Sequence, residues 1–283
     1  MIEQPARTQV SDHTWFAEGQ SAFSGAALAL MRRLDGLFVE LAVACGAAEH
    51  QFPPFLPAAA LHRIDYFGSF PHLATFPVNL NRADANLRQF SCEPVDATER
   101  LRLTALDAPA HVLTPSACYH FYRLFEGRRF DQPVYVTTQA QCFRREDHYV
   151  PLERQWAFTM REIVCIGTSG EVEQFLESCR TRVSALIERL GLPAHWEPAT
   201  DPFFNPAGNS RYIMQQLLPI KHELVFDRRL AIGSVNAHHD HFGRTFNMLR
   251  NGEPLHSGCV AFGVERWVAA IAQHFGSDPA YWP

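Results

Sequence analysis

The stretch from Thr137 to Thr168 reads TTQAQCFRREDHYVPLERQWAFTMREIVCIGT, and it decides how the rest of the chain is interpreted. Apolar, strand-like sequence lies on both sides of a turn-like insert, DHYVPL, which favours a β-hairpin. A solvated strand usually carries charge on one face only, whereas here cations and carboxylates alternate next to the turn. The charged positions are Arg144, Arg145, Glu146, Arg154, Arg161 and Glu162. This pattern predicts a hairpin that holds a charged ligand.

Amphipathic helices are expected on either side of this hairpin. Apolar residues recur at three- and four-residue spacing in the N-terminal part of the chain, which predicts one long helix ending near Gly46. The helix after the hairpin has Ser169 available as a cap and Gly191 at its end. The expected helices cover about 24–45, 171–190 and 262–275.

The remaining apolar segments read as strands joined by short turns. FPPFLP at 52–57 cannot continue a helix, because proline fixes φ and lacks a donor, and residues 62–73 are expected to form strand and turn. Hairpin-linked strands with few helices favour an α+β fold built on an antiparallel sheet rather than a doubly wound one. We expect one domain over 1–283, with a small helical insertion at about 171–220.

Composition excludes several classes of protein. The chain has 283 residues, is 47% hydrophobic and 19% charged, and carries a formal net charge of -5, so no nucleic-acid surface is indicated. No run approaches the length of a membrane span, and the N-terminus lacks a secretory signal, which predicts a cytoplasmic protein. The cysteines, of which there are 7, form no tight framework, so reduced thiols are expected.

The hairpin residues fit a nucleotide in physical terms. Arg144 can fork onto a phosphate, Glu146 can accept from an adenine amino group, and Phe158 offers a flat face for the base. Near the C-terminus, Arg266 lies close to the start of an expected amphipathic helix. The positive N-terminal end of such a helix can bind the terminal phosphates of a nucleotide. Each signal alone is weak, because a charged tetrapeptide of this kind is more often a surface strand with an ion pair.

Taken together, in this order and spacing, these segments resemble the catalytic domain of class II aminoacyl-tRNA synthetases. The resemblance extends to the zinc-dependent, methanogen-type seryl-tRNA synthetases and to their truncated bacterial relatives, the amino acid:carrier-protein ligases. The stretches that carry it are LTPSACYHFY, CFRREDHYVPLERQWAFTMREIVCIGT, ELVFDRRLAIGSVNAHHDHFG and SGCVAFGVERW. Residues 24–57 correspond to motif 1, residues 135–167 to motif 2 and residues 258–272 to motif 3.

The resemblance implies an ATP-dependent ligase that activates a small amino acid, glycine or alanine, and passes it to the phosphopantetheine thiol of a carrier protein. It also implies a homodimer built across motif 1. Transfer to tRNA is not expected, because the chain is net acidic, starts almost at the motif 1 helix and leaves no room for a separate tRNA-binding domain. Docking of the carrier is considered at Arg180, Arg182 and Arg189, with a solvated helix face as the alternative.

The resemblance further implies a metal site that sequence spacing does not reveal. Cys118, Glu162 and Cys259 correspond to the family's zinc ligands, one Zn²⁺ per subunit, with a fourth position open to the amino group of the substrate. Taken singly, each cysteine is more often a small buried hydrophobe.

The family roles of the other residues are carried over with some departures. Arg144 and Arg266 are the expected catalytic arginines, ATP contacts are expected at Arg144, Glu146, Arg154, Phe158, Glu223 and Arg266, and substrate contacts at Ser234 and Asn236. Ala231 stands where a carboxylate often binds Mg²⁺, so Glu223 is considered as its substitute for the Mg²⁺ that accompanies ATP. Met160 stands where the seryl enzymes have an arginine, although Arg161 follows, which puts serine as substrate in doubt.

Two other readings are open. The chain can be a catalytically silent class II paralogue that binds an amino acid or nucleotide as a regulator. The segment AHHDH, residues 237–241, also resembles a metallohydrolase cluster, and on a strand His239 and His241 would share one face. Such sites need further ligands from other segments, and no recognised spacing supplies them.

Overall fold

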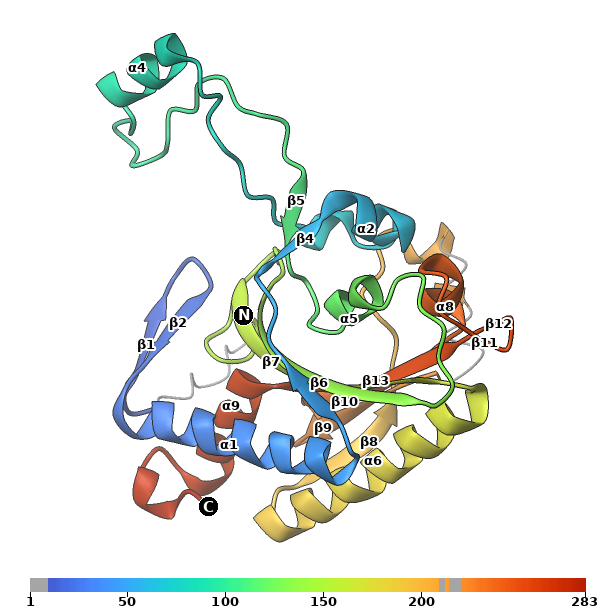
Figure 1. Cartoon of the computed structure of the whole chain (residues 1–283). Helices are drawn as coiled ribbons and strands as arrows, with labels where there is room; N and C mark the ends of the chain where they lie inside the picture. Colours follow the sequence, from blue (N-terminus) through green and yellow to red (C-terminus); the bar gives the residue numbers. More distant parts are fainter. Residues whose placement is uncertain (1–9, 209–211, 214–219) are drawn as a thin grey trace.

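The computed structural model describes residues 10–208, 212–213 and 220–283, and a curved central sheet runs through the body of the molecule (Figure 1). The strands are β1 (His13–Phe16), β2 (Gln20–Phe23), β3 (Ala48–His50), β4 (Phe55–Pro57), β5 (His111–Leu113), β6 (Val134–Phe143), β7 (Ala157–Gly167), β8 (Ala194–Pro198), β9 (Lys221–Phe226), β10 (Leu230–His239), β11 (Leu249–Arg250), β12 (Glu253–Pro254) and β13 (His256–Gly263). The α-helices are α1 (Gly25–Ala44), α2 (Ala58–Arg63), α3 (Tyr66–Ser69), α4 (Asp84–Cys92), α5 (Tyr119–Leu124), α6 (Ser169–Leu190), α8 (His241–Thr245) and α9 (Val264–Phe275). Short 3-10 turns are η1 (Pro71–Leu73), η2 (Pro206–Gly208) and η3 (Pro279–Tyr281).

The central sheet confirms the predicted α+β fold. Its 7 strands follow the order β3-β6-β7-β13-β10-β9-β8. Every neighbouring pair is antiparallel except β3 and β6, which run parallel. The predicted hairpin is β6 and β7, paired without interruption from Val134 opposite Ile166 to Phe143 opposite Ala157. The stretch from Thr137 to Thr168 therefore forms two neighbouring inner strands of the sheet.

The two faces of the sheet are covered differently. Helices α1, α6 and α9 lie over one face (Figure 1) and bury it in the larger hydrophobic core. Helices α2, α3, α5 and α8 pack over the other face around a second core. Because side chains alternate along a strand, Ile163 and Cys165 of β7 enter the first core while Val164 and Ile166 enter the second. Each strand thus contributes to both layers.

The helices agree with the sequence pattern in the long elements and differ at some ends. Helix α1 confirms the first expected helix. Helix α6 begins at Ser169, two residues before the expected start at 171, because Thr168 rather than Ser169 is its cap. The Thr168 side chain accepts from the Glu171 N–H, and the Glu171 carboxylate accepts from the Thr168 N–H. Gly191 ends it in the left-handed conformation, φ 64. Helix α9 starts at Val264, since the two residues before it complete β13.

The prediction of strand and turn for residues 62–73 is wrong. This segment forms the end of α2, then α3 and η1, with Asp65 in the left-handed conformation between the two helices. Tyr66 packs against Phe67 and Phe70 on one short helical segment and is buried in the second core. Local aromatic content did not distinguish a buried helix from a strand.

The segment expected as an insertion at 171–220 consists of α6, then β8 at the edge of the central sheet, then η2. Part of it, 209–211 and 214–219, lies outside the described residues.

Within the described part of the chain, no helix is both long and apolar enough to cross a membrane. Residues 74–110 form an arm that carries α4 and projects from the body (Figure 1).

Arg161 connects three elements beneath the sheet. Its side chain is 3% exposed, and it donates from Nε and Nη2 to Asp35 of α1, at 2.8 and 2.7 Å, and from Nη1 to Glu49 of β3 at 2.6 Å. Since neighbouring residues on a strand point to opposite faces, Arg161 faces α1 and its neighbour Met160 faces the other side. Arg161 thus fixes α1 and β3 against β7, and its guanidinium points away from the face on which Met160 lies.

Replacing Arg161 with methionine is expected to lower the free energy of unfolding by about 3 kcal/mol, because Asp35 and Glu49 lose a buried partner. Urea unfolding followed by circular dichroism measures this. The matched control is Arg102→Met, which breaks an ion pair whose side chains are 49% and 69% exposed and is expected to cost about 0.5 kcal/mol. Equal losses in the two variants would contradict the role assigned to Arg161.

Candidate active site

A cavity of about 520 Å³ lies on the sheet face opposite α1 and α6. Strands β7, β13, β10 and β9 line it together with the loop after β6 and the segment before α5. It brings together every site residue expected from the sequence: Cys118, Arg144, Glu146, Arg154, Phe158, Glu162, Glu223, Ser234, Asn236, Cys259 and Arg266. These residues come from distant parts of the chain, so their convergence is a property of the fold.

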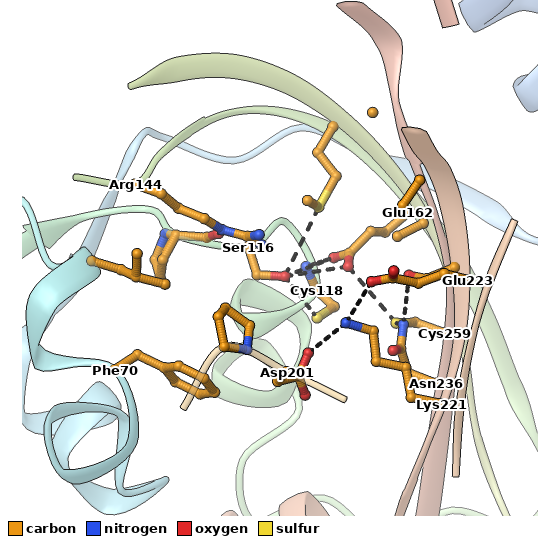
Figure 2. A pocket seen from close by; sticks show the side chains of 18 of the residues that line it. Phe70, Ser116, Cys118, Arg144, Glu162, Asp201, Lys221, Glu223, Asn236 and Cys259 are labelled. Atoms are coloured by element: carbon orange, nitrogen blue, oxygen red, sulfur yellow. Dashed lines mark hydrogen bonds and ion pairs between the residues drawn. The ribbon is translucent and has the colours of Figure 1, made fainter. Parts of the chain in front are cut away.

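One part of the cavity is a cluster of metal-ligating groups. A sulfur of Cys118, a sulfur of Cys259 and a carboxylate oxygen of Glu162 all lie within 4.8 Å of one another, and all three residues are buried. Glu162 and Cys259 project from neighbouring strands β7 and β13, and Cys118 stands at the start of α5. The backbone N–H of Cys118 donates to the Glu162 carboxylate, and Ser116 Oγ donates to the same carboxylate at 3.2 Å (Figure 2). These two hydrogen bonds hold the Glu162 carboxylate beside Cys118.

The donor chemistry of this cluster fits zinc. Two thiolates and one carboxylate are ligands that Zn²⁺ accepts, whereas Mg²⁺ and Ca²⁺ take oxygen ligands. Burial raises the pKa of both the Cys118 thiol and the Glu162 carboxyl, so a bound cation is what would favour their charged forms. Three protein ligands also leave a further coordination position for a small molecule.

The Cys259 sulfur has two polar neighbours from β10. Asn236 Nδ2 donates to it at 3.4 Å, and His238 Nε2 lies 3.6 Å away. The other ring nitrogen of His238 lies 3.0 Å from the Tyr122 hydroxyl and 3.2 Å from the Ser257 hydroxyl. Burial lowers the pKa of His238 to about 3, so its imidazole is neutral. These contacts orient one ligand of the cluster.

The AHHDH segment does not form a strand on which His239 and His241 share one face. Strand β10 ends at His239, whose φ is 50, and α8 begins at His241, so His239 and His241 do not alternate along one strand. Asp240 pairs with Arg244 instead. Among the residues that the structure describes, the only group of three or more His, Cys, Asp and Glu donors close enough to hold a metal is Cys118, Glu162 and Cys259. The segment therefore supplies His238 as a neighbour of that group rather than a second metal site.

The opposite part of the cavity is cationic. Arg144 donates from Nε to the Pro115 carbonyl at 2.9 Å, and Arg266 donates to the Glu153 and Ala231 carbonyls at 2.7 and 2.9 Å. A guanidinium has five N–H donors, so these bonds fix both side chains and leave donors for a ligand. Burial, and after it the charge of Arg144, lowers the pKa of Arg266. An anionic ligand would relieve this repulsion.

Four of the expected nucleotide contacts interact in two pairs in this structure. Arg154 Nη1 and Glu146 Oε2 form an ion pair at 3.1 Å. The guanidinium of Arg144 lies over the Phe158 ring, 5.3 Å from its centroid. A base that stacks on Phe158 on this side would therefore meet Arg144 as well.

Lys221 and Asp201 are site residues that the sequence analysis missed. Lys221 is the only lysine of the chain and is 9% exposed. Its Nζ lies 2.7 Å from Asp201 Oδ1 and 3.0 Å from Glu223 Oε1, beside Asn236 and Cys259 (Figure 2). Burial alone would lower the pKa of Lys221, but the two carboxylates outweigh it and raise the pKa. Glu223 is thus already paired with a cation, which weakens its assignment to Mg²⁺.

The arginines considered for carrier docking lie elsewhere. Helix α6, which carries Arg180, Arg182 and Arg189, packs on the sheet face opposite the cavity, and none of the described cavity residues comes from it. Arg180 also lies over the Trp196 ring, 5.7 Å from its centroid. A carrier protein seated on α6 would have the sheet between itself and the cavity, so we do not assign it there.

Comparison with known proteins identifies the family. The tRNA synthetase class II core domain (G, H, P, S and T) matches residues 106–275. The chain is 33% identical over 285 residues to amino acid–acyl-carrier-protein ligase 1 of Bradyrhizobium diazoefficiens, which covers 96% of this chain and 84% of the relative. It is 36% identical over 248 residues to ligase 2 of the same organism, covering 82% of this chain and 71% of the relative. The chain belongs to the amino acid–acyl-carrier-protein ligase family. The resemblance inferred from the sequence is confirmed.

More distant relatives of the family are longer than this chain. The type-2 serine–tRNA ligase of Methanocaldococcus jannaschii is 27% identical, and the chain spans 54% of its length. A crystal structure of M. kandleri SerRS in complex with A. aeolicus tRNASec matches with a TM-score of 0.79 at 22% identity, covering 100% of this chain and 56% of that chain. A prolyl-tRNA synthetase of Cryptosporidium parvum matches with a TM-score of 0.69 at 12% identity, covering 96% of this chain and 51% of that chain. These structures confirm the class II synthetase-like fold.

Glu265 is a further cavity residue, and the pKa of its carboxyl group is raised. Its carboxylate accepts from the Thr159 N–H at 2.8 and 2.9 Å, and burial raises the pKa of Glu265 from 4.5 to about 7. A carboxyl whose pKa is higher in the folded state binds its proton more tightly there. Its contribution to stability is therefore complete below pH 4.5 and is lost as the pH rises to about 7.

Glu265→Gln is expected to remove this pH dependence, because the amide oxygen still accepts from Thr159 and does not ionise. The free energy of unfolding of the unmodified protein should fall by about 1.4 kcal/mol per pH unit relative to the variant between pH 4.5 and about 7. Urea titrations at several pH values measure the difference. Parallel curves for the two proteins across this range would contradict the shifted pKa.

Proposed function

We propose that the protein activates a small amino acid with ATP and transfers the aminoacyl group to the phosphopantetheine thiol of a carrier protein. One observation carries the proposal: a single cavity holds a cluster of arginines at one part and a buried Cys/Glu/Cys cluster at the other. The first suits the phosphates of a nucleotide and the second suits a metal that selects an amino acid. The names of the two Bradyrhizobium relatives support the same reaction.

In the first step, a carboxylate oxygen of the amino acid attacks the α-phosphorus of ATP. The bond between the α-phosphorus and the bridging oxygen breaks, pyrophosphate leaves, and an aminoacyl-adenylate remains. Arg144 holds the α-phosphate, and Arg154 and Arg266 hold the β- and γ-phosphates. Glu146 and Phe158 contact the adenine. No protein nucleophile takes part, so the rate comes from positioning and from fixed positive charge near the reacting phosphate.

Cys118, Glu162 and Cys259 hold one Zn²⁺ per subunit in this proposal. The bound ion supplies a coordination position for the free amino group and so selects α-amino acids. Asn236 and His238 orient the Cys259 sulfur, which keeps the ligand set rigid.

The amino acid occupies the space between this cluster and the arginines. Ser234 and Asn236 line that space, and Asn236 Nδ2 donates to Ser234 Oγ at 3.0 Å. Lys221 with Asp201 and Glu223 forms the neighbouring wall. Glycine or alanine is the proposed substrate, as the family resemblance implies. The two differ by one methyl group, which changes binding by only about 1 to 3 kcal/mol. Mg²⁺ accompanies the triphosphate of ATP, and Glu223, which is already paired with Lys221, is the one residue considered for it.

In the second step, the phosphopantetheine thiol of the carrier attacks the carbonyl carbon of the adenylate, a thioester forms, and AMP leaves. Transfer to tRNA is not part of the proposal, because the chain has a formal net charge of -5 and no basic stripe was found in its sequence. We also propose that the protein forms a homodimer whose interface is made by residues 24–57, the motif 1 segment.

The alternative function is regulation by a silent paralogue that binds the amino acid or nucleotide without reaction. Such a protein would need the cavity but not its full set of phosphate-binding arginines. Arg144, Arg154 and Arg266 all line the cavity, and Arg144 and Arg266 are held by backbone carbonyls, so the proposal of an enzyme is favoured.

Amino-acid-dependent exchange of pyrophosphate into ATP tests the proposal directly. We expect exchange with glycine or alanine among the twenty amino acids, and its loss on treatment with a zinc chelator followed by recovery with Zn²⁺. Binding of ATP and amino acid by calorimetry without any exchange would favour the regulator.

Substituting the arginines tests their role in the first step. Arg144→Ala and Arg266→Ala are each expected to lower kcat of the exchange by about 10²–10³-fold, the loss typical of one fixed transition-state donor. Arg145→Ala is the matched control, because Arg145 adjoins Arg144 in sequence, is exposed and does not line the cavity. A similar loss in Arg145→Ala would show that the effect is not specific to the cavity.

Metal analysis separates the Cys/Glu/Cys site from the histidine-rich segment. One zinc per chain is expected by mass spectrometry in the unmodified protein and in a variant with His239→Ala and His241→Ala. Zinc should be lost from Cys259→Ala. The reverse result would support a metallohydrolase-like site.

A further inference from the structure

A second pair of cysteines lies outside the cavity. Cys45 stands at the C-terminal cap of α1, and Cys179 lies within α6, 134 residues along the chain. Their sulfur atoms are 3.6 Å apart. The two helices cover the same face of the sheet (Figure 1), and neither cysteine lines the cavity. The contact is therefore a feature of how α1 and α6 pack, separate from the metal-ligating cluster.

The two thiols differ in access and acidity. Cys45 is partly exposed, whereas Cys179 is buried. A hydrogen bond from Cys179, and the charge of Arg182 to a smaller extent, lower the pKa of the Cys45 thiol against the opposing effect of burial. The same hydrogen bond, together with burial, raises the pKa of Cys179. Because the thiolate is the nucleophile, Cys45 is the sulfur that reacts first, and Cys179 is the partner within reach.

We propose that Cys45 and Cys179 form a site of reversible oxidation, at which a hydroperoxide converts the two thiols into a disulfide. The Cys45 thiolate attacks one peroxide oxygen, the O–O bond breaks, and Cys45 becomes a sulfenic acid as the other oxygen leaves as hydroxide or alkoxide and takes up a proton. The Cys179 sulfur then attacks the Cys45 sulfur and expels the hydroxyl, which leaves as water with the Cys179 proton. Two thiols and one hydroperoxide thus give one disulfide, one water, and one alcohol or a second water.

The disulfide would join α1 to α6. Helix α1 packs against α9, which carries Arg266, and α6 packs against β13 and β10, which carry Cys259 and Asn236. Oxidation would therefore link the two helices that support the sheet from behind, without consuming a cavity residue. This site does not depend on the proposed ligase activity and is tested without it.

The test treats the folded, zinc-supplemented full-length protein with hydrogen peroxide, blocks the remaining thiols and maps peptides under non-reducing conditions. A Cys45–Cys179 cross-linked peptide that dithiothreitol removes is expected in the unmodified protein. The same cross-linked peptide is expected in two control variants. Cys92→Ser removes an exposed thiol without a thiol partner, and Cys165→Ser removes another buried thiol of the core that contains Cys179.

Variants of the pair separate the two roles. In Cys179→Ser, Cys45 should be trapped by dimedone as a sulfenic acid with no cross-link, and in Cys45→Ser, Cys179 should stay a thiol. The unmodified protein should also show a higher Tm after oxidation, a shift absent from Cys179→Ser, because a cross-link over a long loop constrains the unfolded chain. A cross-link that contains Cys165, one between Cys118 and Cys259 alone, or an unmodified Cys45 would each overturn the proposal.

Discussion

The alternation of side chains along β7 is the constraint on which the site depends. Glu162 points into the cavity because Arg161, one residue earlier, points to the opposite face and is held there by Asp35 and Glu49. A shift of one residue in the pairing of β7 would exchange the two, burying a carboxylate beneath α1 and placing a guanidinium in the metal-ligating cluster. The ion pairs of Arg161 and the register of the sheet therefore favour the same side-chain arrangement. Each of them makes a one-residue shift of β7 energetically unfavourable.

The cavity then holds the arginines as well as the metal-ligating cluster. The arginines are separated in the chain, yet Arg144 and Arg266 are both oriented by backbone carbonyls rather than by carboxylates. A carboxylate partner would neutralise them, whereas a carbonyl fixes their direction and leaves the charge available to a ligand. Lys221 is the contrasting case, because its two carboxylate neighbours compensate its charge within the protein. Lys221 therefore offers less free positive charge to a phosphate than Arg144 and Arg266 do.

The sequence predicted the fold, and the site residues that it named all line one cavity, for reasons that can be stated residue by residue. The hairpin and the long helices have clear periodicity, and motif spacing identified the family. The metal-ligating cluster was found only through the family resemblance, because Cys118 and Glu162 are 44 residues apart and Glu162 and Cys259 are 97 apart. Residues 62–73 were misassigned because a short aromatic segment has no clear period. Lys221 was missed, although its being the only lysine in an arginine-rich chain was a signal.

The position of Arg266 shows how the core serves the cavity. It is carried by α9, whose neighbouring residues Val264, Trp267 and Val268 are fully buried against the sheet. A helix fixed in this way cannot shift to accommodate its own charged residue, so the burial of Arg266 and Glu265 is imposed by the packing of their neighbours. The same packing places the positive end of α9 at the cavity. The apolar contacts on the other side of α9 therefore offset the electrostatic repulsion between Arg266 and Arg144. An anion bound in the cavity would reduce that repulsion.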